Sequence, residues 1–434
     1  MAKVNKFKDF CCRAVGFDPS QHRVTTEIIA GITTFISLAY ILAVNPQMLS
    51  LTGMDQGATF SATAIAAAIG TLLCAFLARL PFAQAPAMGA NAFFAYTVCL
   101  TMGYSWQFAL TGVLIEGIIF IIFSVTGVRE WIINIIPECV KIGIGVGIGC
   151  LIAFLGLKSA GVIVANPGTY IALGDITSGS ALLAMIGLII MSALIVRKVK
   201  GALLIGILIT TVIGIPMGIT HLKGIVSAPP SLAPVFCHFE WKNILSLDML
   251  IVVITLLSMD MFDTIGTILS LSRKAGNVDQ KGLNRALLCD SIATVCGSIV
   301  GTSTVGTYVE SSSGIQSGGR TGLTSLTTGL LLLISLFLAP LFLSIPAAAI
   351  GAALFLVGVS MVEGIKQLYF HDPAEYIPGL VTMLAIPFTF SIANGIILGM
   401  ISFTLVNLFT TGFKKVSWGL IILTLVLSLK FVLQ

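Results

Sequence analysis

Long apolar stretches separated by short polar loops recur along nearly the whole chain. Runs of about eighteen or more nearly uncharged residues can cross a hydrocarbon core of roughly 30 Å as a helix. The pattern predicts seven spans before a polar connection at residues 221–246 and seven after it. The expected spans cover residues 27–50, 57–78, 82–102, 107–127, 137–157, 180–197 and 201–219, then 248–271, 282–301, 303–319, 322–343, 346–365, 376–392 and 394–412.

Composition argues against a soluble globular protein. Of 434 residues, 57% are hydrophobic and 9% are charged, and the mean hydropathy is +1.05, whereas soluble domains carry about 25% charged residues. We therefore expect an all-α polytopic membrane protein surrounded by membrane lipid. The net charge of +5 comes from basic residues scattered through loops. Because no basic patch with interleaved aromatics occurs, nucleic acid is not an expected partner.

The positions of lysine and arginine predict the orientation of the spans, because basic residues collect in cytoplasmic loops. Basic clusters fall in the loops at 197–200, 273–285 and 414–415. This makes residues 1–26 a cytoplasmic N-terminal segment, without a cleaved signal, of a multi-pass protein of the cytoplasmic (inner) cell membrane. The last hydrophobic segment, within residues 413–434, contains Lys430 and either lies in the interface or adds a span.

An odd number of spans in each half gives homologous halves opposite orientations. We therefore expect two inverted repeats of seven spans, at residues 27–220 and 247–412, joined by an extracytoplasmic connection at 221–246.

The third span of each half is irregular. Two prolines and a glycine interrupt residues 81–89, and residues 302–309 are rich in Thr and Val and are expected to be extended. Each segment leads into a short helix, one starting near Asn91 and the other near Glu310. Such backbone is tolerated at membrane depth where protein or a water-filled cavity satisfies it, so the pair predicts the binding site. Simple proline or glycine kinks are the alternative.

Acidic side chains inside the spans are costly to bury, so each is a functional candidate. Asp260 and Asp263 are three residues apart and share one face of the eighth span. Asp290 lies in the ninth span, Glu310 at the break of the tenth and Glu116 in the fourth. Because burial disfavours the charged form, such carboxyls can hold a proton at neutral pH, as a proton-coupled carrier requires. Structural hydrogen bonding is the alternative for each.

Asn91 can cap its short helix, or it can bind a ligand opposite Glu310. An amide that donates and accepts, facing a carboxylate that accepts, suits a flat heterocycle with ring N–H and carbonyl edges. Phe94 and Tyr308, with Phe93 and Phe262, are the nearest aromatics that can stack on such a ring, although ordinary packing is the alternative for each.

Other chemistries lack their motifs. The nine cysteines and four histidines show no metal-ligand spacing, and no nucleotide-binding or hydrolase motif occurs. We therefore expect a protein that is not an enzyme and has no catalytic site, metal site or cofactor. Transport is then expected to depend on an ion gradient. The glycines of 143–149 (GIGVGIG) predict close helix packing.

Four segments carry a family resemblance. They are 26–35 (TEIIAGITTF), 85–96 (APAMGANAFFAY), 258–264 (SMDMFDT) and 301–311 (GTSTVGTYVES), the last continuing to 318–322 (GGRTG). The chain resembles the AzgA-like hypoxanthine/guanine/adenine permeases, a branch of the nucleobase/ascorbate transporter superfamily. The resemblance implies a fourteen-span fold with a core domain from spans 1–4 and 8–11, a gate domain from spans 5–7 and 12–14, and proton symport of a purine base by an elevator-like movement.

The resemblance also implies roles for individual residues. Substrate contacts fall at Asn91, Asp260 and Glu310, with Asp263 and Asp290 in transport and Glu310 contributing to proton coupling. The rest of the expected substrate site is Gly89, Ala90, Phe94, Tyr308 and Ser311. Ser311 stands where the nucleobase/xanthine branch has Asn, which argues against xanthine, urate or uracil.

Alternatives remain at this stage. A uracil/xanthine-type symporter and an anion exchanger on a related fold are the other functions, and sodium is the other coupling ion. The sequence does not rank adenine, guanine and hypoxanthine. It leaves the oligomeric state open, a homodimer included.

Overall fold

The computed structural model describes residues 14–126, 137–177, 179–276, 278–410, 416–421, 424–425 and 428. Its helices before the central connection are α2 (Val24–Leu38), α3 (Ile41–Ser50), α4 (Gln56–Leu73), η1 (Cys74–Ala78), α5 (Met88–Ala92), η2 (Phe93–Thr101), α6 (Trp106–Thr126), α8 (Glu138–Ser159), α9 (Gly179–Val196) and α10 (Ala202–Gly214). After it come α11 (Leu247–Ala275), α12 (Gln280–Val300), α13 (Ser311–Gln316), α14 (Gly322–Ile334), η3 (Ser335–Leu338), α15 (Ala339–Leu343), α16 (Ala347–Val362), η4 (Glu363–Gln367), α17 (Pro373–Thr389) and α18 (Ile392–Thr410).

The chain is a helical, multi-pass membrane protein. Within the described residues, nine helices are long and apolar enough to cross a membrane, and three shorter apolar helices accompany them. Each of the fourteen expected segments matches one or more consecutive helices, and in the third and tenth segments a short strand precedes the helix. Fourteen crossings in two inverted repeats remain a prediction. The expectations for residues 1–13, for Lys414 and Lys415 and for Lys430 lie outside the described residues.

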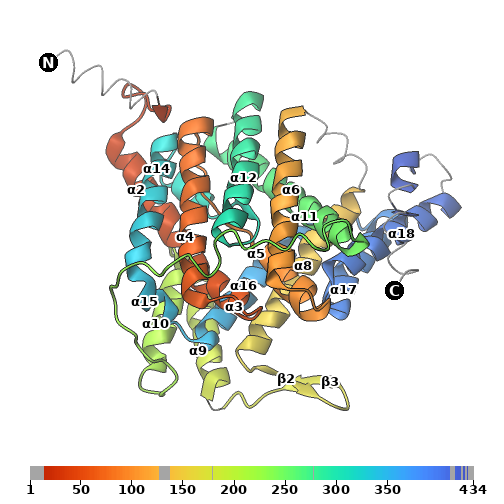
Figure 1. Cartoon of the computed structure of the whole chain (residues 1–434), viewed down its shortest axis with the longest axis horizontal. Helices are drawn as coiled ribbons and strands as arrows, with labels where there is room; N and C mark the ends of the chain where they lie inside the picture. Colours follow the sequence, from red (N-terminus) through yellow and green to blue (C-terminus); the bar gives the residue numbers. More distant parts are fainter. Residues whose placement is uncertain are drawn as a thin grey trace.

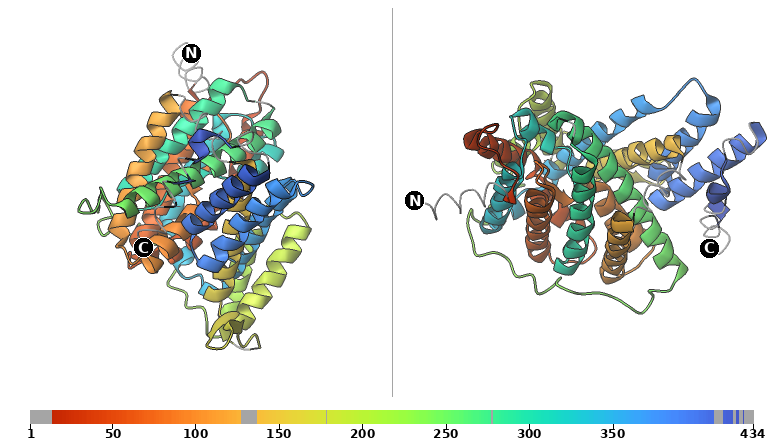
Figure 2. Two further views of the ribbon diagram at one scale, coloured as in Figure 1. Left: turned by 90° about the vertical axis from the view of Figure 1, so that its right-hand side faces the viewer. Right: turned by 90° about the horizontal axis from the view of Figure 1, so that it is seen from above.

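The helices pack into two groups (Figures 1 and 2). In the first group, α2, α3, α4, α6, α11, α12, α13 and α14 contact one another. In the second, α8, α9, α10, α16, α17 and α18 do so. The loop between α10 and α11 crosses the outside of the molecule and joins the two halves of the chain (Figure 1). Contacts between the groups are few, and they involve mainly α2, α3, α5 and α11.

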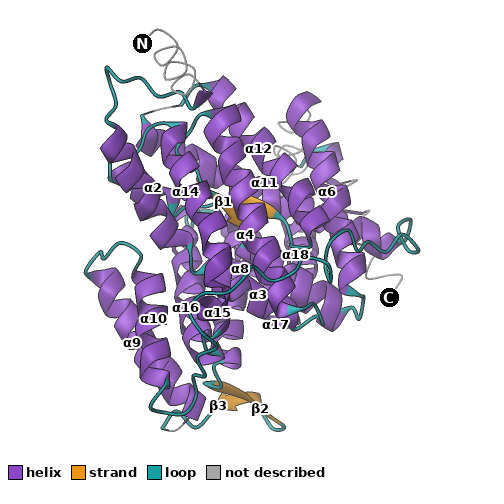
Figure 3. Cartoon of the chain, turned by 60° about the vertical axis from the view of Figure 1, so that its left-hand side comes forward, coloured by secondary structure: helices purple, strands orange, loops and turns teal. Residues whose placement is uncertain are grey.

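Two short strands meet at the centre of the first group (Figure 3). Strand β1 (Gln84–Pro86) pairs antiparallel with β4 (Val305–Thr307), with Ala85 opposite Gly306. The backbone N–H of Ala87 donates to the Thr304 carbonyl at 2.8 Å, which extends the pairing by one residue. Both segments are therefore extended, as expected, and the pairing joins the third and tenth segments of the chain. A separate β-hairpin, β2 (Ile163–Asn166) with β3 (Tyr170–Leu173), lies at the end of α8.

Local sequence sets the ends of the long helices. Asp55, Ser246 and Asp279 cap α4, α11 and α12 by accepting hydrogen bonds from backbone N–H groups of the first turn. Gly276 and Gly301 end α11 and α12 at φ of 108° and 97°, in the left-handed region that favours glycine.

The helix after β1 begins earlier than the sequence predicts. Ala87 is its N-cap residue, and the N–H of Asn91 already donates to the Ala87 carbonyl at 2.9 Å. Asn91 therefore lies inside α5, and the expectation that it caps the helix is wrong. The reason is that no proline follows Pro86 in this segment. Every later residue has an N–H to donate, so helical hydrogen bonding can start directly after the strand. Glu310, in contrast, is at the N-cap position of α13, as expected.

Close packing of α8 explains its glycines. An added Cβ at Gly143 would lie 2.4 Å from the Gly379 carbonyl oxygen of α17, and one at Gly149 would lie 2.7 Å from the Gly358 carbonyl oxygen of α16. Gly145 has nothing within 4 Å of that position. The prediction of close helix packing is confirmed, and Gly145 is an open position on the same helix, at the second cavity.

The shape of the 318–322 turn depends on a buried carboxylate of α2. Glu27 is 1% exposed. It accepts hydrogen bonds from the N–H groups of Arg320 and Thr321 and from the Thr324 hydroxyl. The Arg320 side chain in turn donates to the Ile315 and Gly319 carbonyls at the end of α13. These bonds fix α13 and α14 against α2.

Candidate functional site

Two adjoining cavities lie between the helix groups, with volumes of about 280 and 250 Å³. Both are lined by Ala87, Gly89, Asp263, Thr267 and Met361. The first cavity reaches α2, β4, α10 and α16, and the second reaches α5, α8 and α11. The paired strands thus lead directly to a site walled by both groups.

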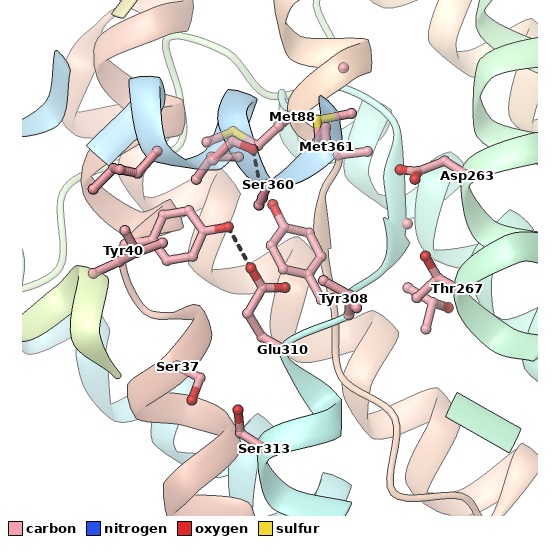
Figure 4. A pocket seen from close by; sticks show the side chains of 18 of the residues that line it. Ser37, Tyr40, Met88, Asp263, Thr267, Tyr308, Glu310, Ser313, Ser360 and Met361 are labelled. Atoms are coloured by element: carbon pink, nitrogen blue, oxygen red, sulfur yellow. Dashed lines mark hydrogen bonds between the residues drawn. The ribbon is translucent and has the colours of Figure 1, made fainter. Parts of the chain in front are cut away.

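Glu310 lies in the wall of the first cavity, just after β4 (Figure 4). The Tyr40 hydroxyl donates to Glu310 Oε1 at 2.8 Å. Tyr40 occupies the turn between α2 and α3, and its ring is 1% exposed. The Tyr308 ring lies beside Glu310, and its hydroxyl donates to the Pro86 carbonyl at 2.6 Å (Figure 4). One Glu310 oxygen is therefore held by Tyr40 in a polar wall built from β1, β4 and the α2–α3 turn.

Asp260 and Asp263 share one face of α11, as predicted. Asp263 is exposed and lines both cavities, whereas Asp260 is 2% exposed and lines the second cavity alone. On the opposite wall of the second cavity lies Lys141 of α8, whose ammonium is 3.0 Å from Glu138 Oε2. The site therefore has three acidic side chains from the first helix group and one basic side chain from the second.

Four expected site residues lie behind the cavity walls. Phe94 and Asn91 are 1% and 0% exposed, and neither lines a described cavity. The Ser303 hydroxyl donates to Asn91 Oδ1. Ser311 accepts a hydrogen bond from the Ala83 N–H at 2.9 Å, which ties α13 to the segment before β1. Asp290 is also fully buried. Substrate contact by Asn91, Phe94 and Ser311 stays a prediction.

The remaining expected positions are at the cavity walls. Gly89 lines both cavities, Ala90 the second and Tyr308 the first. An added Cβ at Gly89 would lie 3.2 Å from Ile148 of α8. Glycine therefore lets α5 approach α8 closely beside the site.

Sequence reasoning missed Tyr40, Thr267, Lys141 and Met361. A phenol inside the first apolar span was a usable signal for Tyr40, since a buried hydroxyl needs a partner. Lys141 was assigned to topology alone. Among the described residues, no group of three or more His, Cys, Asp or Glu side chains has an arrangement that could hold a metal ion.

The sequence of this chain matches a known family profile. The profile, described as "Permease family", matches residues 25–428. The chain belongs to this permease family. A putative permease of Methanocaldococcus jannaschii is 47% identical over 96% of this chain and 97% of its own length.

Two characterised relatives have more specific names. The adenine permease AdeP of Escherichia coli is 42% identical over 96% of this chain and 95% of its own length. The guanine/hypoxanthine permease PbuG of Bacillus subtilis is 42% identical over 89% of this chain and 91% of its own length. The resemblance stated from the motifs is therefore confirmed, and these relatives are transporters rather than enzymes.

Solved structures support the fold of this permease. The transmembrane domain of the cyanobacterial bicarbonate transporter BicA superposes with a TM-score of 0.66 at 18% identity, covering 86% of this chain and 97% of that one. The anion transporter Slc26a9 of mouse gives 0.64 at 13% identity, over 91% of this chain and 70% of that one. At these identities the similarity shows a shared transporter fold alone.

Proposed function

We propose that this permease is a secondary active transporter that imports purine nucleobases, namely hypoxanthine, guanine or adenine, by proton symport. The observation that carries the proposal is the acidic wall of the cavities between the two helix groups, formed by Glu310, Asp260 and Asp263. The carboxylate oxygens of Glu310 and Asp260 can accept hydrogen bonds from the ring N–H donors of a purine. The names of the relatives AdeP and PbuG point to the same class of substrate.

The shape of the site suits a flat ring. The first cavity, about 280 Å³ in volume, is near the lower end of the range for small-molecule sites. Tyr308 presents an aromatic ring beside Glu310, and Met88 and Met361 add apolar surface (Figure 4). A base lying in this cavity has a carboxylate at one edge and apolar groups at its faces.

The arrangement also supports an elevator-like movement of a core domain against a gate domain. The proposed core comprises the first helix group, which holds β1, β4 and the acidic residues, and the proposed gate comprises the second. The open position at Gly145 of α8 and the sparse contacts between the groups leave room for sliding. An anion exchanger is less favoured, because three acidic side chains and one lysine line the site.

Transport by proteoliposomes containing the purified protein tests the proposal. Uptake of labelled hypoxanthine is measured with and without an imposed pH gradient, in competition with guanine, adenine, xanthine, uracil and sulfate. We expect a pH gradient to drive accumulation and only the three purine bases to compete strongly. Competition by sulfate, or no uptake of any purine, would contradict the proposal.

A further inference from the structure

Behind Asp260 lies a group of fully buried carboxyls that the proposed substrate site does not use. Glu116 of α6 and Asp290 of α12 are 0% exposed and line neither cavity. Glu116 and Asp260 lie beside the same short segment: the Thr304 hydroxyl is 3.2 Å from Glu116 Oε2, and a Cβ added at Gly306 would lie 3.6 Å from Asp260 Oδ1. Within the described residues, no Lys, Arg or His side chain forms an ion pair with Glu116, Asp260 or Asp290.

Hydrogen-bond donors in this group are too few for three carboxylates. The Thr264 hydroxyl has one hydrogen and lies 2.9 Å from Asp290 Oδ2 and 3.3 Å from Asp260 Oδ1, so the shorter bond goes to Asp290. The Thr307 hydroxyl also donates to Asp290, at 3.3 Å. The hydroxyls of Thr264 and Thr307 therefore both donate to Asp290, and its charge is partly satisfied.

Glu116 and Asp260, in contrast, each keep an oxygen without a partner. The Thr304 hydroxyl donates to Glu116 Oε2 at 3.2 Å, but Glu116 Oε1 and Asp260 Oδ2 have no donor. Leaving buried charged oxygens unpaired is costly, and two adjacent carboxylates repel each other. One proton on the pair removes both costs, because a carboxylic acid can donate to the neighbouring carboxylate.

We propose that Glu116 and Asp260 hold one exchangeable proton between them and that this pair is the site of the coupling proton. In the loaded state the proton is on Glu116 Oε1 and donates to Asp260 Oδ2. Unloading transfers it from the pair to water in the second cavity, which Asp260 lines, and the charge of the pair goes from −1 to −2. No other group needs to be oxidised, reduced or cleaved.

The groups facing Glu116 support this assignment. On α11 it faces Asp260, with Asp263 one turn further along at both cavities. Helix α12, which packs on α6, carries Asp290, and Thr304 in the segment before β4 donates to Glu116. Helix η2, which also packs on α6, contains Tyr96 and Cys99 but no charged residue. Thr304 links the pair to the site, since its carbonyl accepts from the N–H of Ala87 in the cavity wall.

The substitution Glu116→Gln tests the inference, which rests on the proposed proton symport. An amide at this position donates to Asp260 permanently and so mimics the protonated acid. In proteoliposomes, we expect purine counterflow and purine binding to persist, accumulation driven by a pH gradient to fall at least tenfold, and the pH dependence of purine affinity to flatten. Glu363→Gln, at an exposed carboxylate outside both cavities, is the matched control.

Different outcomes separate the two proposals. If wild type takes up no purine, the proposed function fails. If wild type accumulates purine with a pH gradient and Glu116→Gln does so equally, with an unchanged pH profile, the proton assignment to Glu116 is overturned. Accumulation by wild type driven by a sodium gradient alone also overturns it.

The variant Glu116→Asp gives a second test that does not depend on the folding of Glu116→Gln. Glu116→Asp keeps an ionisable carboxyl one methylene shorter. We expect it to retain accumulation driven by a pH gradient at a reduced rate, with a pH-dependent affinity for purine. Counterflow without any such accumulation in Glu116→Asp would contradict the inference, because the protonatable group is still present.

Discussion

Asp263 is exposed at the junction of the two cavities, one helical turn from Asp260. A carboxyl in this place contacts water from either cavity and can pass a proton without holding the substrate. We predict that Asp263→Asn leaves purine affinity within about threefold, because this carboxyl does not hold the base, and strongly reduces accumulation driven by a pH gradient. Binding by calorimetry and uptake by proteoliposomes are compared on the same preparations. A parallel loss of both would make Asp263 a substrate ligand or a structural residue.

Tyr40 positions Glu310 through the 2.8 Å hydrogen bond from its hydroxyl. Tyr40→Phe removes that donor and keeps the ring, so the carboxylate is less well held for a purine. We predict a loss of about 1 kcal/mol in binding, or roughly fivefold in Kd. Tyr369→Phe is the control, since Tyr369 is exposed and lines neither cavity. An unchanged Kd in Tyr40→Phe would show that the bond does not orient Glu310 for substrate.

At the scale of elements, the glycines of α8 differ in how closely they pack against neighbouring helices. Gly143→Ala forces α8 away from α17, because its Cβ would lie 2.4 Å from a backbone oxygen, and overpacking of this kind costs about 1–3 kcal/mol. Gly145→Ala meets nothing within 4 Å and gains helix propensity. We predict a lower unfolding temperature in detergent for Gly143→Ala and an unchanged or higher one for Gly145→Ala. Equal losses in both would contradict this account of the packing.

Patterns along the chain predicted the elements that matter most. Proline and glycine at 81–89 and the Thr/Val-rich 302–309 segment gave the two extended interruptions, because their local chemistry excludes continuous helix. The antiparallel register of β1 with β4 was not predictable from local chemistry, since it depends on how helices distant in sequence pack around the strands.

Individual contacts were predictable only where spacing determines them. Asp260 and Asp263 share a helix face because they are three residues apart. Tyr40 and Glu310, which are 270 positions apart, meet only through the fold. Asn91 shows an error of local prediction. Its pairing with Ser303 and its burial depend on where α5 starts, and the sequence alone placed that start three residues too late.

At the scale of the whole molecule, orientation in the membrane is the main prediction from basic residues. The connection at 221–246 is expected outside the cell and the 273–285 loop inside. Cys237 is an exposed free thiol in the first, and Gln280 is exposed in the second. In a cysteine-depleted background, we predict that Cys237 reacts with an impermeant maleimide on intact cells and that Gln280→Cys reacts only after permeabilisation. Cys237→Ser is the control, and the reverse pattern would invert the topology.

The central claim is that a purine base binds between the two helix groups, at the carboxylate of Glu310. Its most direct measurement is equilibrium binding of hypoxanthine, guanine and adenine to purified, monodisperse wild type and Glu310→Gln, with Glu363→Gln as the control for a lost surface carboxylate. The amide keeps the shape of Glu310 but places a donor where acceptors are needed. An unpaired buried donor costs about 1–3 kcal/mol, so we predict affinity roughly 5- to 150-fold weaker for Glu310→Gln. Unchanged affinity in this variant would contradict the account by removing Glu310 from the site.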